Sequence, residues 1–302
     1  MNQRFLEQLT EILPEEQIYR DEPMSRHTTF RIGGKADVLV TPTLDQIASV
    51  MELCRDYQVP VTMIGNGSNL LVGDKGIRGL VIELGRPAEK VNIFEEHMEI
   101  GAGTLLSKAA NEAAKAGLSG LEFAAGIPGS MGGAVVMNAG AYGGEMKDVI
   151  QSVTVLTKEG RQKKLSLSEL QLGYRHSCIQ ENEYTVLQAE LLLHRAEETR
   201  IREVMADYRE RRVSKQPLEY PSAGSTFKRP EGYFAGKLID DAGLRGYQVG
   251  GAQVSEKHCG FVVNKGDASA ADVCRLIKDV QDKVFEQFQV HIEPEVKMIG
   301  EF

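Results

Sequence analysis

The chain runs AAGIPGSMGGAVVMNAGAYG over residues 124–143, and no other stretch constrains the fold as strongly. Six of these 20 residues are glycine and five are alanine, a density that turns alone do not explain. Glycine lets the backbone approach a flat ligand, although in regular structure each one costs roughly 0.5–1 kcal/mol relative to alanine. The run therefore favours a ligand-binding wall, with a crowded seam between domains as the alternative.

A second glycine-containing loop is predicted after an earlier strand. Residues 59–64 have the apolar character of a short buried strand and lead directly into Gly65-Asn66-Gly67-Ser68-Asn69. Because the third glycine of a dinucleotide fingerprint is missing and no acidic residue follows at the usual distance, a Rossmann fold is disfavoured. Successive backbone amides in this loop could cup a pyrophosphate, and a plain tight turn explains the loop equally well.

Helices and strands alternate along the rest of the chain, which is typical of an α+β protein. An amphipathic helix is predicted near the N-terminus, and the next helix is predicted to start with a capping box of Thr43 and Gln46. The other elements are helices at residues 105–116, 197–212 and 269–288, a hairpin over 152–167 turning at Glu159-Gly160, and strands at 79–84, 90–100, 184–194, 249–254, 260–263 and 290–299.

Composition narrows the class of protein. The chain has 302 residues, 42% hydrophobic and 26% charged, as in a globular protein of two or three domains. The net charge of −8 argues against non-specific nucleic-acid binding, so an anionic ligand would need a local basic patch. Candidates for that patch are Arg211, Arg212, Lys215, Lys228, Arg229, Lys237, Arg245 and Lys257.

Several other classes of protein are disfavoured. No apolar run reaches the length of a bilayer, and charges interrupt the apolar positions at the N-terminus, so we expect a cytoplasmic protein without a membrane span or signal peptide. The four cysteines lack the close pairs of zinc or redox sites, and the six histidines form no HExxH pair. We therefore expect reduced cysteines and no metal site.

Motifs in a fixed order give the sequence a family likeness that covers nearly the whole chain. It resembles the UDP-N-acetylenolpyruvoylglucosamine reductase family, which makes the peptidoglycan precursor UDP-N-acetylmuramate. The motifs that carry the likeness are His27-Thr28-Thr29-Phe30-Arg31-Ile32-Gly33-Gly34, Gly65-Asn66-Gly67-Ser68-Asn69-Leu70, Ala125-Gly126-Ile127-Pro128-Gly129-Ser130, Met137-Asn138-Ala139-Gly140-Ala141-Tyr142, Tyr174-Arg175, Gly224-Ser225-x-Phe227-Lys228 and Glu293-Pro294-Glu295-Val296.

The resemblance implies an α+β architecture: a two-subdomain FAD-binding fold of the vanillyl-alcohol-oxidase type plus a smaller α+β substrate domain. On this chain the FAD-binding subdomains would be residues 1–80 and 81–215, and the substrate domain 216–302, whose final strand could return to the FAD-binding part. It also implies non-covalent FAD, and NADPH as a co-substrate that shares one cleft with the UDP-sugar. A monomer is favoured.

Three catalytic residues are implied by the same resemblance: Ser225, Arg175 and Glu295. Hydride transfer to the enol ether pushes negative charge into an enediolate. Arg175 suits binding of the substrate carboxylate through charge-assisted hydrogen bonds, and Glu295, if protonated, could donate from the other side. Ser225 suits protonation of the neighbouring carbon.

Binding residues are carried over in the same way. The cofactor would contact Gly65, Asn66, Gly67, Ser68, Asn69, Gly126, Pro128, Gly129, Ser130, Gly132, Gly133, Asn138, Gly140 and Ala141, and the substrate Lys228, Arg229, Lys237 and Tyr174. Only about 50 residues separate Arg175 from Ser225, which leaves no room for the substrate-covering insertion of the family's longer form. The chain therefore resembles the shorter form, in which Arg229 stands where the longer form has asparagine.

Other functions compete with this one. They are an oxidase of the same fold, a dehydrogenase that uses nicotinamide alone, and a nucleotide-binding module without catalysis. Flavin that stays on the denatured polypeptide would favour the oxidase, and a colourless protein that takes up no FAD would favour the other two.

Overall fold

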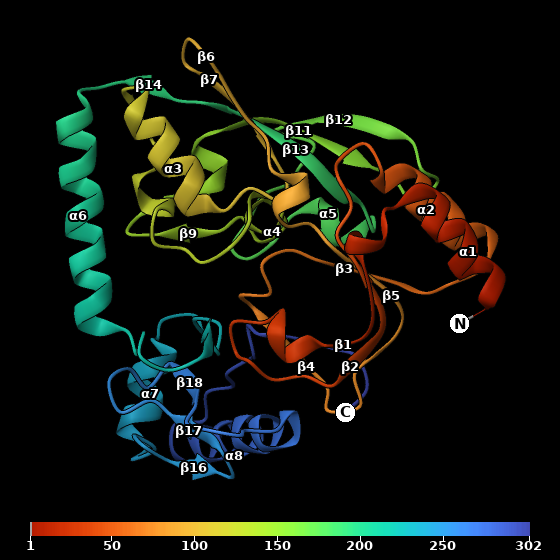
Figure 1. The fold of residues 1–302 in the computed structure, drawn as a ribbon. Helices are drawn as coiled ribbons and strands as arrows, with labels where there is room; N and C mark the ends of the chain where they lie inside the picture. Colours follow the sequence, from red (N-terminus) through yellow and green to blue (C-terminus); the bar gives the residue numbers. More distant parts are fainter. Residues whose placement is uncertain (1) are drawn as a thin grey trace. The chain divides into compact units, whose positions relative to one another are not determined.

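The computed structural model describes residues 2–302, which form two compact units (Figure 1). Unit 1 comprises residues 2–19, Val38–Asn66 and Gly79–Arg212. Unit 2 comprises Arg20–Asp37, Gly67–Arg78 and Val213–Phe302. Each unit has its own core of buried apolar side chains. The three domains predicted from the sequence were defined by the ligand that each would bind, and their boundaries remain a prediction.

The main sheet of unit 1 has five antiparallel strands in the order β12-β11-β13-β7-β6. Its strands are β6 (Val91–Phe94), β7 (His97–Gly101), β11 (Ile150–Leu156), β12 (Gln162–Ser166) and β13 (Thr185–Leu192). Figure 1 shows β11 and β13 side by side within it. The predicted hairpin turn at Glu159-Gly160 is present, with Gly160 at φ +81°, whereas the strand predicted over residues 90–100 is a β6–β7 hairpin.

A second, four-stranded sheet has the order β1-β2-β5-β3. The strands are β1 (Ile18–Pro23), β2 (Lys35–Val40), β3 (Val61–Ile64) and β5 (Ile77–Glu83), and β3 pairs with β5 in parallel. Two further strand pairs are β8 (Leu118–Ser119) with β14 (His194–Arg195), and β9 (Gly140–Ala141) with β10 (Gly144–Glu145).

The helices predicted in unit 1 are all present, and two short helices were not predicted. The predicted helices correspond to α1 (Gln3–Ile12), α2 (Ile47–Asp56), α3 (Leu106–Lys115) and α6 (Glu198–Lys215). Thr43 N–H donates to Gln46 Oε1 at 2.8 Å, as in a capping box, but α2 itself begins only after Gln46. The short helices α4 (Met131–Met137) and α5 (Cys178–Glu181) were not predicted.

Unit 2 combines a sheet of order β15-β18-β17-β16 with two helices. Its elements are β15 (Ser222–Ser225), α7 (Ala235–Asp241), β16 (Gln248–Val249), β17 (Ala252–Val254), β18 (Phe261–Asn264) and α8 (Ala270–Phe288), together with β4 (Leu70–Val72), which pairs in parallel with β19 (Lys297–Ile299). The strand predicted over residues 249–254 is in fact a hairpin of β16 and β17.

The long helix α8 shows how unit 2 is held together. It begins where predicted, because Ser269 and Asp272 form a reciprocal capping box. The Asp74 carboxylate also accepts from the backbone N–H groups of Ala270 at 2.7 Å and Ala271 at 3.0 Å. A carboxylate is favoured at this end because free N–H groups and the helix dipole both attract negative charge. The segment around β4 is thereby fastened to the start of α8.

Within residues 2–302, no helix combines the length and the apolar character that crossing a membrane requires.

Candidate functional site

Ser225 is the last residue of β15 in unit 2 and is exposed. It is followed by Thr226, which is 1% exposed and whose Oγ1 accepts from the Val262 N–H at 3.0 Å. Thr226 and the next residue, Phe227, are both buried, whereas the adjacent Ser225 is accessible. Thr226 was not singled out in the sequence, and its burial depends on its bond to the separate strand β18.

Glu295 lies on the segment that pairs with residues 226–228, just beyond the end of β15. Its backbone N–H donates to the Thr226 carbonyl oxygen at 2.7 Å, and the Lys228 N–H donates to the Glu293 carbonyl oxygen at 2.8 Å. Asn69 Nδ2 donates to the Glu295 carbonyl oxygen at 3.2 Å. Two of the three predicted catalytic residues, Ser225 and Glu295, are therefore brought together, with the predicted cofactor residue Asn69 beside them.

The predicted substrate-binding cations of unit 2 already have contacts. Lys228 Nζ lies 2.8 Å from Glu293 Oε2, and this hydrogen bond is the main cause of a lowered pKa of the Glu293 carboxyl group. Lys237 forms an ion pair with Asp241. Exposed pairs of this kind contribute only about 0–1 kcal/mol, so a bound diphosphate can compete for either lysine. Arg229 stacks over the exposed Phe234 ring, 4.0 Å from its centroid.

Arg175 belongs to unit 1 and lies in a tight turn between β12 and α5. Gly173 N–H donates to the His176 carbonyl oxygen at 3.1 Å, and His176 N–H donates back at 3.3 Å. Arg175 has φ +55°, a left-handed conformation that costs a residue with a side chain roughly 1–2 kcal/mol. Its guanidinium carbon lies 5.0 Å from the centroid of the exposed Tyr174 ring, so the side chains of these two predicted residues contact each other.

The glycine run meets the Gly65 loop within unit 1. Asn66 Nδ2 donates to the Pro128 carbonyl oxygen at 2.6 Å. A Cβ atom added at Gly65 would lie 2.3 Å from Ser130 Oγ, so only glycine allows this approach without displacing the hydroxyl. The two loops that the family resemblance assigns to FAD therefore lie against each other.

Ser130 carries an unusual buried hydroxyl. Its side chain is 2% exposed, and Ser130 Oγ has no hydrogen-bond partner among the described residues. Although Ser130 is the N-cap of α4, its side chain makes no capping bond. An unpaired buried hydroxyl costs about 1–3 kcal/mol, so this atom fits a site completed by a polar ligand such as FAD.

Arg212, near the end of α6, is a cation of the predicted basic patch that contacts the glycine run. Its Cδ would be 3.2 Å from a Cβ atom at Gly126, which means that the side chain packs on the backbone there. Burial lowers the pKa of its guanidinium, which nevertheless stays charged. No carboxylate in the described part of the chain forms an ion pair with it, so an anionic group of a ligand can take that place.

The other predicted cofactor residues are divided between the units. Gly129, Gly132, Gly133, Gly140 and Ala141 accompany the glycine run in unit 1, whereas Gly67, Ser68 and Asn69 are in unit 2. Asn138 is buried, and both side-chain N–H donors are used by protein acceptors. That all of these residues, and Arg175 with Ser225 and Glu295, converge on one cleft remains a prediction.

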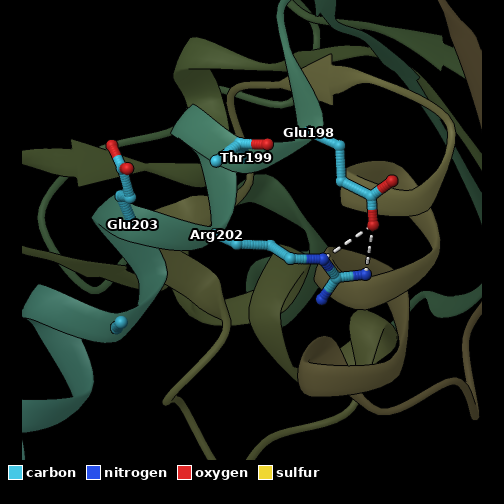
Figure 2. A pocket seen from close by; sticks show the side chains of 5 residues that line it. Glu198, Thr199, Arg202 and Glu203 are labelled. Carbon is cyan, nitrogen blue, oxygen red and sulfur yellow. Dashed lines mark hydrogen bonds and ion pairs between the residues drawn. The ribbon is translucent and has the colours of Figure 1, made fainter.

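A hollow of about 470 Å³ lies elsewhere, along the first turns of α6 (Figure 2). Figure 2 shows Arg202 turned toward Glu198, with which it forms a 2.7 Å ion pair. The hollow contains none of the predicted site residues, since its lining is Glu198, Thr199, Arg202, Glu203 and Ala206. All five belong to one helix, so no second element supplies the converging polar groups that a ligand site needs.

No cluster of three or more histidine, cysteine, aspartate or glutamate side chains suited to a metal ion occurs among residues 2–302.

Known protein families match an N-terminal and a C-terminal stretch of this chain. Residues 36–166 match a profile described as an FAD binding domain, and residues 216–299 match the C-terminal domain of UDP-N-acetylenolpyruvoylglucosamine reductase. A UDP-N-acetylenolpyruvoylglucosamine reductase of Agathobacter rectalis is 59% identical over 314 aligned positions that cover 100% of both chains.

Two solved structures resemble the fold. The UDP-N-acetylenolpyruvylglucosamine reductase of Thermus caldophilus has a TM-score of 0.80 and 38% identity, covering 93% of this chain and 98% of its own. An alkyldihydroxyacetonephosphate synthase has a TM-score of 0.52 and 18% identity over 65% of this chain and 41% of its own, a likeness of fold alone. Together with the FAD-domain match, these confirm the predicted α+β fold with an FAD-binding part.

Proposed function

The chain belongs to the UDP-N-acetylenolpyruvoylglucosamine reductase family, and we propose that it reduces the enolpyruvyl group of UDP-N-acetylglucosamine enolpyruvate to give UDP-N-acetylmuramate, with NADPH as electron donor. Membership makes it an FAD-binding oxidoreductase of peptidoglycan precursor synthesis. The observation that carries the proposed chemistry is the pairing of the Ser225 and Glu295 segments through the 2.7 Å bond from Glu295 N–H to the Thr226 carbonyl.

FAD would be held non-covalently by the loops that meet in unit 1. Gly65 and the glycine run offer backbone without side chains, Ser130 offers a buried hydroxyl, and Arg212 offers a half-buried cation for the diphosphate. Bound FAD would supply the redox chemistry, as the carrier of a hydride between NADPH and the enolpyruvyl group. We propose that NADPH and the UDP-sugar use the same cleft in turn, that the enzyme is a monomer, and that it works in the cytoplasm.

The residues of this chain stabilise the charge that hydride transfer creates on the substrate. The hydride adds to the terminal carbon of the C=C bond, and the electron pair of that bond moves toward the carboxylate. Arg175 binds the carboxylate through its planar pair of N–H donors, and a protonated Glu295 donates a hydrogen bond from the other side. Ser225 then gives its proton to the second carbon, which completes the lactyl ether, and Lys228 steadies the transient alkoxide.

The binding of the UDP part follows from the cations of unit 2. Lys228, Arg229 and Lys237 would contact the diphosphate, and Tyr174 on the Arg175 turn would pack against the substrate. We propose that residues 1–80 and 81–215 bind FAD and that residues 216–302 bind the substrate.

A flavin absorbance trace tests the proposed function. The purified protein should be yellow, NADPH should bleach it in the absence of oxygen, and UDP-N-acetylglucosamine enolpyruvate should restore the colour. Substrate without NADPH is the control and should change nothing. A protein that takes up no FAD, or whose reduced flavin is not reoxidised by this substrate, would contradict the proposal.

Ser130→Ala is expected to weaken FAD binding without lowering the stability of the FAD-free protein. Removing a buried hydroxyl that has no protein partner should leave the free energy of unfolding of the FAD-free protein unchanged or higher. If the hydroxyl bonds to FAD, the same change should weaken FAD binding by about 1 kcal/mol, or roughly fivefold in Kd. Flavin titration and urea unfolding of the FAD-free protein measure the two quantities.

Thr104→Val is the matched control for this experiment. The Thr104 hydroxyl is also buried, but it bonds to the backbone of Lys90, at 3.1 Å from both the nitrogen and the oxygen. Its removal should lower stability by about 1 kcal/mol and leave FAD affinity unchanged. A Ser130→Ala protein that loses stability and keeps its FAD affinity would show that the hydroxyl has no part in the cofactor site.

A further inference from the structure

Asn138 ends α4 within the glycine run, and its side-chain amide is held by three hydrogen bonds. Nδ2 donates to Glu145 Oε2 at 2.7 Å and to the Gly173 carbonyl oxygen at 3.0 Å, while Oδ1 accepts from the Lys147 N–H at 2.9 Å. Two acceptors face the nitrogen and one donor faces the oxygen, so the flipped amide would lose all three bonds. The residue is 1% exposed, which makes these bonds part of the buried structure of unit 1.

We propose that Asn138 is a positioning residue for the Arg175 turn and thereby for capture of the substrate carboxylate. The inference rests on the carboxylate-binding role proposed for Arg175. This positioning role differs from the cofactor contact that the family resemblance implies for Asn138, because both amide N–H donors of Asn138 are already used inside the protein.

The Arg175 turn needs such an anchor. Gly173 and His176 close the turn, and Tyr174 and Arg175 are its two central residues. Since Arg175 is in the left-handed region at φ +55°, the turn is not a conformation that the local sequence favours by itself. The bond from Asn138 Nδ2 to the Gly173 carbonyl fixes the residue at which the turn begins.

A second bond fixes the other end of the turn to the same helix. Ser177 is fully buried, and its Oγ donates to the Val136 carbonyl oxygen of α4 at 2.7 Å. The segment that carries Arg175 is thus tied to the last turn of α4 both before and after the arginine. Because a misplacement of about 1 Å can reduce a rate by about 10²-fold, loss of either anchor should impair the step in which Arg175 acts.

Asn138→Gly is the sharpest test. Asn138 has φ +41° and ψ +56°, which glycine adopts without strain, so the substitution removes the hydrogen bonds and keeps the backbone conformation. We expect unchanged FAD content and unchanged reduction of the flavin by NADPH, and reoxidation by the enolpyruvyl sugar nucleotide slowed by about tenfold or more. Anaerobic stopped-flow spectroscopy of the two half-reactions gives both rates.

Ser152→Ala is the matched control. The Ser152 hydroxyl is a largely buried donor to Glu190 Oε2 at 2.8 Å in the main sheet of unit 1, and this bond does not involve the Arg175 turn. Removing this hydroxyl should lower the free energy of unfolding, and it should not slow one half-reaction more than the other. If Asn138→Gly and the parent protein reoxidise at the same rate, or if Asn138→Gly slows both half-reactions equally, the positioning role is wrong. A parent protein that the substrate does not reoxidise would instead overturn the proposed function, and this inference with it.

The reoxidation rate of a double variant at Asn138 and Arg175 provides an independent test. If Asn138 acts through Arg175, Asn138→Gly should slow reoxidation much less in an Arg175→Lys background than in the parent, because residues in one pathway are not additive. Additive losses would overturn the inference. Should Asn138→Gly not fold, Ser177→Ala tests the other anchor with the same expectation, and an unchanged reoxidation rate in that variant would count equally against the proposal.

Discussion

Replacing Ser225 with alanine is expected to slow reoxidation of the flavin by the enolpyruvyl sugar nucleotide by about 10²–10⁴-fold, the usual contribution of a general acid. Reduction of the flavin by NADPH should remain nearly unchanged, because that step needs no proton from the serine. In free energy the expected loss is roughly 3–5 kcal/mol of transition-state stabilisation. Stopped-flow measurement of the two half-reactions separates the effects.

Ser222→Ala is the control for this variant, since it changes the same residue type at the other end of β15. It should leave both half-reactions unchanged. Equal losses in the two half-reactions of Ser225→Ala would refute proton donation, because a general defect in the site would then explain the result. Solvent deuterium should slow reoxidation in the parent protein more than flavin reduction, if proton transfer contributes to the rate.

Arg175→Lys is expected to impair the same half-reaction by about 10–100-fold, which corresponds to the 1.5–3 kcal/mol of a hydrogen bond to a charged group. Lysine keeps the positive charge but cannot reproduce the planar pair of donors that matches a carboxylate. The loss should therefore appear in reoxidation of the flavin and not in its reduction by NADPH. Varying the substrate concentration in the stopped-flow experiment separates weaker binding from a slower step.

The control for Arg175→Lys is Arg195→Lys, which changes another arginine of unit 1. The Arg195 guanidinium donates to the Ala116 carbonyl oxygen at 3.3 Å near the surface. This variant should behave like the parent protein in both half-reactions. An unchanged reoxidation rate in Arg175→Lys would remove Arg175 from the mechanism.

The sequence predicted the parts of the fold and of the site that depend on local pattern. The start of α8 was predicted at Ser269, where the structure has a capping box, and the hairpin turn was predicted at Glu159-Gly160, where Gly160 has φ +81°. The glycine run was predicted as a wall, and the contact of Gly65 with Ser130 supports close backbone approach there. The helix α4 inside the run was missed, because glycine has a low helix propensity and here tertiary packing overrides it.

Features that depend on distant segments could not be predicted in this way. The strand predicted over residues 290–299 is reduced to β19, because residues 293–295 bond instead to the backbone beyond Ser225. The left-handed conformation of Arg175 is likewise invisible in the sequence, since arginine has no preference for it and the turn is anchored by Asn138 from a separate helix. Only the family resemblance pointed to Arg175 at all.

Unit 2 is assembled from three separate stretches of chain, and this has a consequence for how the enzyme can be dissected. A recombinant fragment beginning at residue 213 would lack Asp74, which caps α8, Leu71, which is buried in the core, and the strand with which β19 pairs. During synthesis, the segments around residues 20–37 and 67–78 emerge long before the C-terminal stretch that they pack against. The nascent polypeptide therefore carries these early segments without their C-terminal partners until translation is nearly finished.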